Sequence, residues 1–409
     1  MKSIDVVPTW YWPDGVPRYL TPPRSTIYKA AVERWARRTP DNIALDEDAV
    51  RIDYRTLNER VRNASVRIQQ TLDGRYDDNR AMRVAVAASQ GINGAVAILG
   101  ALHAGADTLL IDPATSNSEI QQVLSNFGCG LLLADDAAGY QDAWNKVSVQ
   151  EISLPLTANG NDPEFFASDR SLAARLGFRW GGAVVLQPNA TLLGWSLGFR
   201  SFAMLDKSDL FIVLQPFATW EGVIGLLAPL LVGATAILHS GSLYDVPEST
   251  THEHLKGVWL DWVDAETLAL SPSARERRGR WEWIYVSVDS PLSVRKRRRL
   301  ERLLGAQLLT ILGTPATGPI AGSPRTWHID EAVGTPMTGV DLFPVDSHAG
   351  RLANPPWPLL AAASVGVKSN FLAPEMSIEG AAPGRFISED VLDTGVTGMI
   401  DANGFLYLV

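Results

Sequence analysis

The chain has 409 residues, of which 46% are hydrophobic and 20% charged, and its formal net charge is −9 at pH 7. A chain of this length buries a large core and usually divides into more than one domain, so we expect two or three subdomains. The acidic balance argues against nucleic-acid binding, which requires a basic surface, and no apolar run reaches the roughly 18 residues of a membrane span.

The first half of the chain alternates predicted helices and strands. Its first 15 residues, MKSIDVVPTWYWPDG, lack the apolar segment of a signal peptide. Residues 82–112 have the pattern strand–helix–strand, with the continuous apolar strands of a parallel sheet covered on both faces, and residues 119–135 repeat the helix–strand unit. This alternation predicts a layered α/β fold. Cys129, the single cysteine, is predicted to be a buried small side chain, and the absence of disulfides fits a cytoplasmic protein.

A second α/β series begins near Gly182. Strands are predicted at 182–188, 209–216, 235–238, 281–288 and 306–313, with helices between them. From about Glu331 the segments shorten and proline and glycine become frequent, which indicates a small β-rich part. The expected organisation is therefore an α/β subdomain at 1–175, a second α/β subdomain with a remnant substrate pocket at 176–330, and a small β-rich subdomain at 331–409.

Five segments resemble one family and follow one another in its order: residues 10–20, 38–65, 94–135, 214–238 and 394–409. The resemblance is to the adenylate-forming enzymes, that is, acyl- and aryl-CoA synthetases and the adenylation domains of peptide synthetases. It implies the N-terminal portion of the acyl-CoA synthetase-like fold: two layered α/β subdomains and a small subdomain resembling a β-barrel. The family's small C-terminal lid domain would follow Val409, and we expect it to be absent.

The resemblance also implies where ATP and magnesium would bind. Adenylation joins a carboxylate to the α-phosphate of ATP, so the site must hold phosphate charge with backbone amides, a cation and Mg²⁺. The family places these groups on a glycine-rich loop, a Thr–Glu pair and an aspartate that binds ribose. In this sequence the corresponding positions hold Pro188, Asn189 and Ala190, then Pro315 and Ala316, and finally Val396.

The substrate pocket of the family would lie beside the nucleotide. Thr219 stands where the family usually has a histidine, and Val288 and Asp289 replace the two glycines of its adenine-binding turn. A buried, uncompensated Asp289 would cost several kcal/mol, so we expect the pocket to be reshaped or filled. The residues expected to line it are Thr219, Trp220, Val288, Asp289, Gly313 and Thr314.

These substitutions lead to one main hypothesis and two alternatives. The main hypothesis is a catalytically degenerate pseudo-ligase in acyl or specialised metabolism, with no catalytic residues, no bound metal, and neither ATP nor Mg²⁺ as cofactor. The first alternative is an ATP-independent enzyme that acts on an acyl thioester and uses Asp289, Glu221 or Thr219. The second is an active ATP-dependent carboxylate–CoA ligase whose motifs lie elsewhere in the chain.

Three further features have more than one interpretation. The basic stretch Arg275–Arg302 fits a solvated helix or a surface for an acidic partner such as a carrier protein. His252 and His254 suggest a metal site only weakly, because no other histidine or cysteine is near in sequence. Four tryptophans fit core packing, an aromatic ligand pocket or a docking surface: Trp259, Trp262, Trp281 and Trp283.

The main hypothesis predicts partners rather than cofactors. We expect a protein partner, either a neighbouring biosynthetic enzyme or a carrier protein, and an acyl or aryl small-molecule ligand. Loss of the lid domain would expose apolar surface, which favours a homo- or hetero-oligomer.

Overall fold

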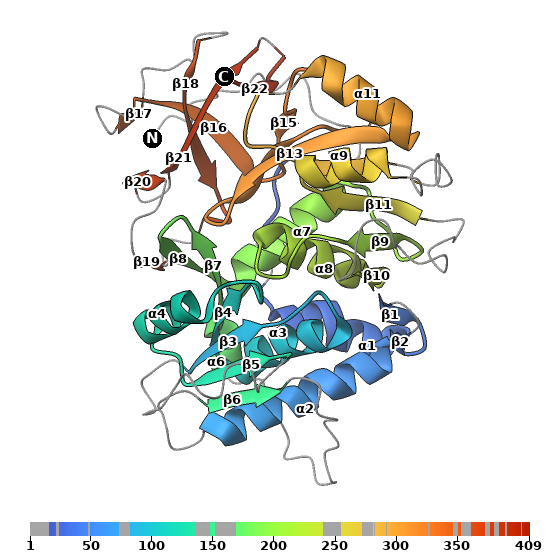
Figure 1. The fold of residues 1–409 in the computed structure, drawn as a ribbon, viewed down its shortest axis with the longest axis vertical. Helices are drawn as coiled ribbons and strands as arrows, with labels where there is room; N and C mark the ends of the chain where they lie inside the picture. Colours follow the sequence, from blue (N-terminus) through green and yellow to red (C-terminus); the bar gives the residue numbers. More distant parts are fainter. Residues whose placement is uncertain are drawn as a thin grey trace.

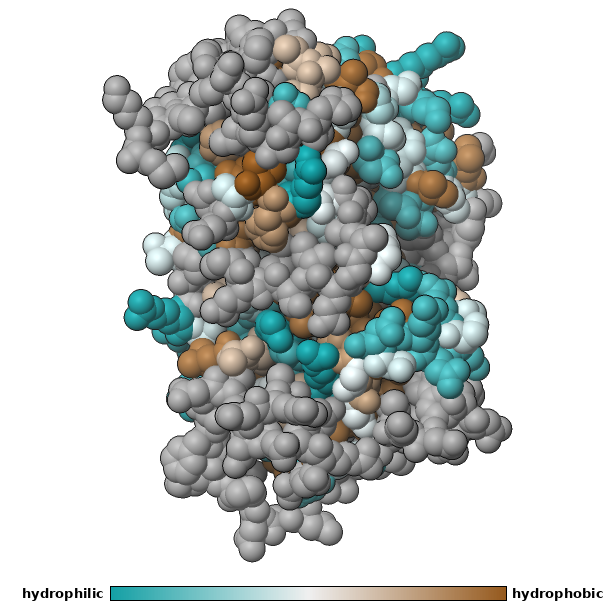
Figure 2. Space-filling model, turned by 90° about the vertical axis from the view of Figure 1, so that its left-hand side faces the viewer, coloured by the Kyte–Doolittle hydropathy of each residue, from teal (hydrophilic) through white to brown (hydrophobic). Residues whose placement is uncertain are grey.

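The computed structural model describes residues 16–21, 24–47, 50–72, 82–135, 148–151, 169–239, 255–271, 281, 283–291, 293–325, 328–346, 351–352, 361–372, 377–379, 384–388, 391–401 and 403–409. These residues form three sheets with helices packed against them (Figure 1). On the face shown in Figure 2, hydrophobic residues lie in small groups between hydrophilic ones. Among the described helices, none combines the length and the apolar character needed to cross a bilayer.

The seven-stranded sheet has the order β19-β8-β7-β4-β3-β5-β6 and is parallel from β7 to β6. Its strands are β3 (Arg83–Ala87), β4 (Asp107–Ile111), β5 (Leu131–Ala134), β6 (Ser148–Glu151), β7 (Arg175–Trp180), β8 (Ala183–Pro188) and β19 (Ser377–Glu379). The helices of this part are η1 (Tyr28–Glu33), α1 (Arg34–Arg38), α2 (Tyr54–Leu72), α3 (Ile92–Ala104), α4 (Asn117–Phe127) and α6 (Asp169–Ala173). Helix α3 is buried almost throughout, between the sheet and α2, as its apolar sequence predicts.

The nine-stranded sheet has the order β15-β14-β13-β12-β11-β9-β10-β1-β2. Its strands are β1 (Ile43–Glu47), β2 (Val50–Asp53), β9 (Leu210–Val213), β10 (Thr235–Leu238), β11 (Leu255–Leu260), β12 (Trp283–Ser287), β13 (Gln307–Thr314), β14 (Gly318–Gly322) and β15 (Thr335–Pro336). Six neighbouring strands from β13 to β1 are parallel. The helices of this part are α7 (Asn189–Phe202), α8 (Trp220–Val232), α9 (Trp262–Leu270) and α11 (Val294–Leu304).

The third sheet is antiparallel and six-stranded, with the order β17-β16-β18-β21-β20 and β22 paired to β21. Its strands are β16 (Val340–Asp346), β17 (Arg351–Leu352), β18 (Ala363–Ser369), β20 (Arg385–Ser388), β21 (Val391–Ile400) and β22 (Leu406–Leu408). The predicted α/β fold class with a small β-rich part is therefore confirmed. The barrel-like detail is not, because the described strands of this part form an open sheet.

The sheets exchange strands along the chain. β1 and β2 lie in the nine-stranded sheet although they precede the strands of the seven-stranded sheet in sequence. β19, which follows strands of both other sheets, pairs with β8 in the seven-stranded sheet. The sheets therefore do not divide at residues 175 and 330. The subdomain boundaries stay a prediction, since strand order alone does not define an independently folding unit.

Cys129 is buried, as expected, and lies two residues before β5. Burial raises the pKa of its thiol to about 12, and the thiol donates a hydrogen bond to the Leu131 carbonyl at 3.1 Å. A thiol with so high a pKa holds little of the reactive thiolate at neutral pH.

Candidate active site

The carboxyl edge of the nine-stranded sheet is the candidate site. β9, β11, β12 and β13 run parallel, so their carboxyl ends lie along one edge, where open α/β sheets bind ligands. Glu221 in the first turn of α8, Ser287 at the end of β12, and Gly313 near the end of β13 all lie at this edge. The residues predicted to line the pocket lie on the same three segments: Thr219, Trp220, Val288, Asp289, Gly313 and Thr314.

Strand β8 runs directly into helix α7, although the family resemblance places a glycine-rich phosphate loop between them. The strand ends at Pro188 and the helix begins at Asn189, so no residue separates the two elements. Just before the junction, the buried Gln187 amide donates to the carbonyls of Pro315 and Ala316, each at 3.0 Å. The end of β8 is therefore bound directly to the turn between β13 and β14.

Asn189 fixes the start of α7 to the N-terminal part of the chain. Its amide nitrogen donates to the carbonyls of Ser171 and Ala174 at 2.9 and 3.0 Å. Its side-chain oxygen accepts a hydrogen bond from the backbone N–H of Ile27 at 3.2 Å. The residue is buried, and its amide serves as a structural tie.

The turn between β13 and β14 satisfies its own polar groups. The hydroxyls of Thr314 and Thr317 lie 2.8 Å apart, and each hydroxyl accepts a hydrogen bond from the other residue's backbone N–H. Ala316 is fully buried between them. The four residues from 314 to 317 contain no carboxylate, so this turn offers Mg²⁺ no carboxylate ligand.

Trp220 packs against the neighbouring strand instead of bordering an open pocket. Its ring lies so close to Gly313 that a Cβ added there would stand 2.5 Å from it. Trp220 also meets Trp259 edge-on at 5.4 Å, and Trp259 stacks on Phe199 at 4.7 Å. The structure thus favours core packing for the predicted tryptophans Trp259, Trp281 and Trp283, all buried, while Trp262 is part-buried.

Glu221 is the titratable group with the most altered environment at this edge. The Ser287 hydroxyl donates to its carboxylate oxygen at 3.4 Å, and Trp259 Nε1 donates to the same hydroxyl at 2.8 Å. Burial, with a smaller contribution from the nearby Asp261 charge, raises the pKa of Glu221 to about 7. A carboxyl group with this pKa can both donate and accept a proton at neutral pH.

Thr219 caps helix α8. Its hydroxyl accepts a hydrogen bond from the Gly222 N–H at 3.2 Å and donates to the Pro216 carbonyl at 2.8 Å. The structure therefore uses this hydroxyl to start the helix, in the way threonine usually acts at an N-cap.

The turn after β12 buries Val288 and leaves Asp289 exposed. Val288 is buried, and its N–H donates to the Ile311 carbonyl at 2.9 Å, which extends the ladder between β12 and β13. Asp289 is exposed. The cost of a buried Asp289 therefore does not arise, because the side chain stays in water and keeps its hydration.

Val396 lies in β21 at the position where the resemblance expects a ribose-binding aspartate. Its side chain is part-buried against the main hydrophobic core. The nearest carboxylate in sequence, Asp393, accepts hydrogen bonds from the Ser364 hydroxyl at 2.5 Å and from the Gly395 N–H at 3.1 Å.

Comparisons with known proteins agree on the family. The family model described as AMP-binding enzyme matches residues 32–171. Bacitracin synthase 1 of Bacillus licheniformis is 33% identical over 105 residues, which is 26% of this chain and 2% of that protein. N-(5-amino-5-carboxypentanoyl)-L-cysteinyl-D-valine synthase of Amycolatopsis lactamdurans is 31% identical over 127 residues, 31% of this chain and 3% of that protein. These matches confirm the resemblance of the chain to the adenylate-forming superfamily.

Solved structures of this superfamily share the fold. VinN has a TM-score of 0.77 at 16% identity, with 94% of this chain and 98% of that chain covered. O-succinylbenzoate coenzyme A synthetase (MenE) of Bacillus subtilis, solved with ATP and magnesium ion, has a TM-score of 0.76 at 16% identity, covering 93% and 78%. At such identities the likeness establishes the fold alone. The chain spans 2–3% of the length of the curated relatives it matches.

These findings overturn the expectation that ATP and Mg²⁺ are not cofactors. The matching family is that of AMP-binding enzymes, and its solved neighbours include proteins holding ATP or ATP with magnesium. We therefore compare the candidate site with what binding of ATP and Mg²⁺ requires. The fit is poor at three places: Pro188 has no amide N–H, the turn 314–317 has no carboxylate, and Val396 cannot accept a hydrogen bond through its side chain.

Sequence reasoning missed three residues of this site. Gln187, Asp261 and Ser287 belong to no motif, but each stands at or just after the end of a strand, which is the signal that could have found them. No group of three or more His, Cys, Asp and Glu that could hold a metal occurs within the described ranges, and His252 and His254 lie outside them.

Proposed function

We propose that this homologue of adenylate-forming enzymes does not complete carboxylate adenylation and serves as a partner or acyl-binding protein in acyl or specialised metabolism. The observation that supports this most directly is the junction of β8 and α7, which has no loop residues and is bound through Gln187 to the turn at 315–316. Phosphoryl chemistry depends on preorganised groups around the phosphates. At this junction such groups are replaced by contacts within the protein.

Packing at the carboxyl edge supports the same proposal. Trp220 covers Gly313, and the aromatic side chains behind it are buried. The proposal concerns the chemical step, and nucleotide binding is a separate property that is measured separately.

The deciding experiment is ATP–pyrophosphate exchange with MgCl₂ and a panel of acyl and aryl carboxylic acids. We expect no carboxylate-dependent exchange above the protein-free rate, while MenE with O-succinylbenzoate serves as the positive control. Isothermal titration with Mg·ATP is run in parallel. Binding without exchange supports the proposal, whereas carboxylate-dependent exchange overturns it and identifies an active carboxylate–CoA ligase.

A second candidate is an ATP-independent step on an acyl thioester, and the environment of Glu221 favours it. Water would add to the thioester carbonyl, the C–S bond would break, and the thiol would leave with a proton supplied by a carboxyl whose pKa is about 7. Release of thiol from acyl-CoA without ATP, lost in Glu221→Gln, would support this candidate. Equal release by Glu221→Gln would exclude the proposed role of that carboxyl.

A further inference from the structure

Helix α11 carries an unusual charge for this molecule. Its 11 residues include six cationic side chains and one acidic one, in a chain whose net charge is −9. Five of the six cations are exposed: Arg295, Lys296, Arg298, Arg299 and Arg302. A positive helix on an acidic protein concentrates positive potential at one place on the surface.

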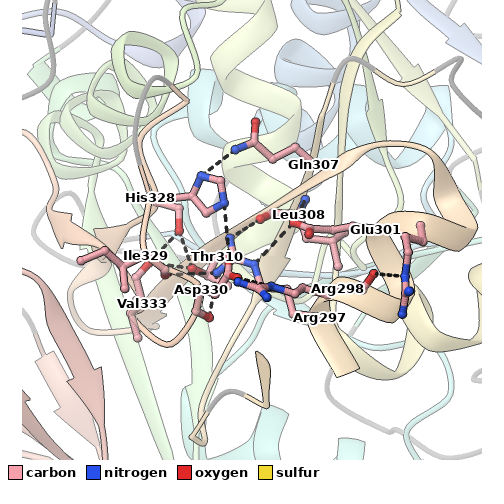
Figure 3. Close-up of polar contacts among 12 residues, drawn as sticks. Arg297, Arg298, Glu301, Gln307, Leu308, Thr310, His328, Ile329, Asp330 and Val333 are labelled. Atoms are coloured by element: carbon pink, nitrogen blue, oxygen red, sulfur yellow. Dashed lines mark hydrogen bonds and ion pairs between the residues drawn. The ribbon is translucent and has the colours of Figure 1, made fainter. Parts of the chain in front are cut away.

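The sixth cation, Arg297, anchors the helix from inside (Figure 3). Its guanidinium is fully buried and donates to the carbonyls of Leu308, Ile329 and Asp330, while its Nε lies 3.6 Å from the Glu301 carboxylate. A buried charge is tolerated only when it is well paired, as it is here. The outer cations therefore stand on a helix that is fixed to β13 and to residues 329–330.

Two of the exposed cations have carboxylate partners, and three have none among the described residues. Lys296 pairs with Glu266 of α9 at 3.4 Å, and Arg298 pairs with Asp330 at 2.6 Å. No ion pair joins Arg295, Arg299 or Arg302 to a carboxylate of the part of the chain that the structure describes. These three positions are spaced four and three residues apart, so they share one helix face, where like charges repel each other.

Two exposed apolar side chains of α9 lie next to this charge. α9 packs beside α11, as Figure 1 shows and the ion pair between Lys296 and Glu266 requires. On α9, Val263 and Leu270 are 69% and 70% exposed, and they are two helical turns apart on the same face. Single exposed apolar residues are ordinary, but here two of them adjoin an unneutralised cationic face.

The geometry points to the outer face of α9 and α11 as a docking surface for an acidic protein segment that also carries apolar side chains. Acidic groups would neutralise Arg295, Arg299 and Arg302, and apolar groups would cover Val263 and Leu270. This deepens the partner role proposed above, and the exchange assay tests the catalytic part independently. Nucleic acid suits the surface less well, because phosphates would pair with the arginines but leave Val263 and Leu270 exposed to water.

The test uses the full chain and a labelled helical peptide rich in glutamate with leucine at every third or fourth position. We expect binding that weakens as sodium chloride rises, because exposed charges are screened. Reversing Arg295, Arg299 and Arg302 to glutamate should lower the association rate at least about tenfold. Val263→Ser with Leu270→Ser should raise the dissociation rate and leave the association rate nearly unchanged.

The matched control reverses three exposed cations elsewhere, Arg37, Arg38 and Lys207, and should bind the peptide as the original chain does. Circular dichroism melting verifies that every variant is folded. The proposal is overturned if the control loses binding equally, or if a Glu→Gln or Leu→Ser peptide binds as tightly. It is also overturned if single-stranded DNA or phosphatidylserine vesicles compete as strongly as the peptide.

Discussion

Residues 32–171 and residues 183–322 share the same α/β construction but differ in how well they keep their family's sequence. The first region matches the AMP-binding family model, whereas the second lies outside the match. The first region supplies β1 to β6 and the helices that cover them, and its apolar runs predict where the buried strands lie. The second region supplies the edge at which ligands bind. A chain can thus keep the apolar runs that form a sheet while the polar residues at the carboxyl edge of that sheet differ from those of the family.

In the second region, residues at or beside the positions where the family binds ATP make structural contacts. Asn189 ties three backbone groups together, Gln187 holds the turn at 315–316, and Trp220 covers Gly313. If these residues now serve the fold, their removal should cost stability in the way that core residues do. If the edge is still an open site, their removal should cost little.

The largest expected effect is that of Trp220→Ala. The side chain is 4% exposed and packs on Gly313 and Trp259, so its removal should lower the free energy of unfolding by about 3–5 kcal/mol. Guanidinium chloride unfolding measures the loss, and Trp262→Ala, at a part-buried tryptophan, serves as the control. A loss below about 1 kcal/mol would mean that the ring borders an open pocket.

Asn189→Ala should have the next largest effect. It leaves the Ile27 N–H and the carbonyls of Ser171 and Ala174 without their partner inside the protein, and we expect a loss of about 2–4 kcal/mol. Asn58→Ala is the matched control, because Asn58 accepts one part-buried hydrogen bond from Tyr28 and should cost only about 0.5–1.5 kcal/mol. Equal losses in urea unfolding would show that the tie at Asn189 is no stronger than a surface contact.

The fold was predictable because its signals are local. Continuous apolar runs such as 83–87 and 131–134 specify buried parallel strands wherever they occur. The assignment of β1 to the nine-stranded sheet was not predictable. β1 pairs with β10 through Leu45 and Ala236, and the sequence of neither strand specifies which strand it pairs with. The exposure of Asp289 was not predictable either, because it depends on a contact between distant segments: the Val288 N–H donates to the Ile311 carbonyl of β13.

Glu221→Gln tests whether Glu221 causes a dependence of the free energy of unfolding on pH. The folded-state pKa of Glu221, about 7, lies above its ordinary value of 4.5, so the native state binds more protons than the unfolded state between these values. Stability must then fall as pH rises from about 4.5 to 7. We expect a decrease of about 1–2 kcal/mol, less than the full shift implies because the residue keeps some solvent contact, and Glu221→Gln should remove it. Unfolding measured across this range, with the exposed Glu59→Gln as control, gives the answer, and an unchanged slope in Glu221→Gln would place the titration elsewhere.

The smallest effect on stability should come from Asp289→Ala. The side chain is exposed at the rim of the edge, so the free energy of unfolding should change by less than about 0.5 kcal/mol. Because the stability is expected to stay the same, a change in ligand binding or in ATP-independent thiol release by this variant cannot be assigned to unfolding. Ser290→Ala, at the neighbouring exposed position, is the control. If Asp289→Ala alone abolishes thiol release, the exposed Asp289 takes part in the reaction, while the buried residues of the carboxyl edge stabilise the fold. If both variants match the original chain, the exposed turn that replaces the family's glycines contributes neither to stability nor to that reaction.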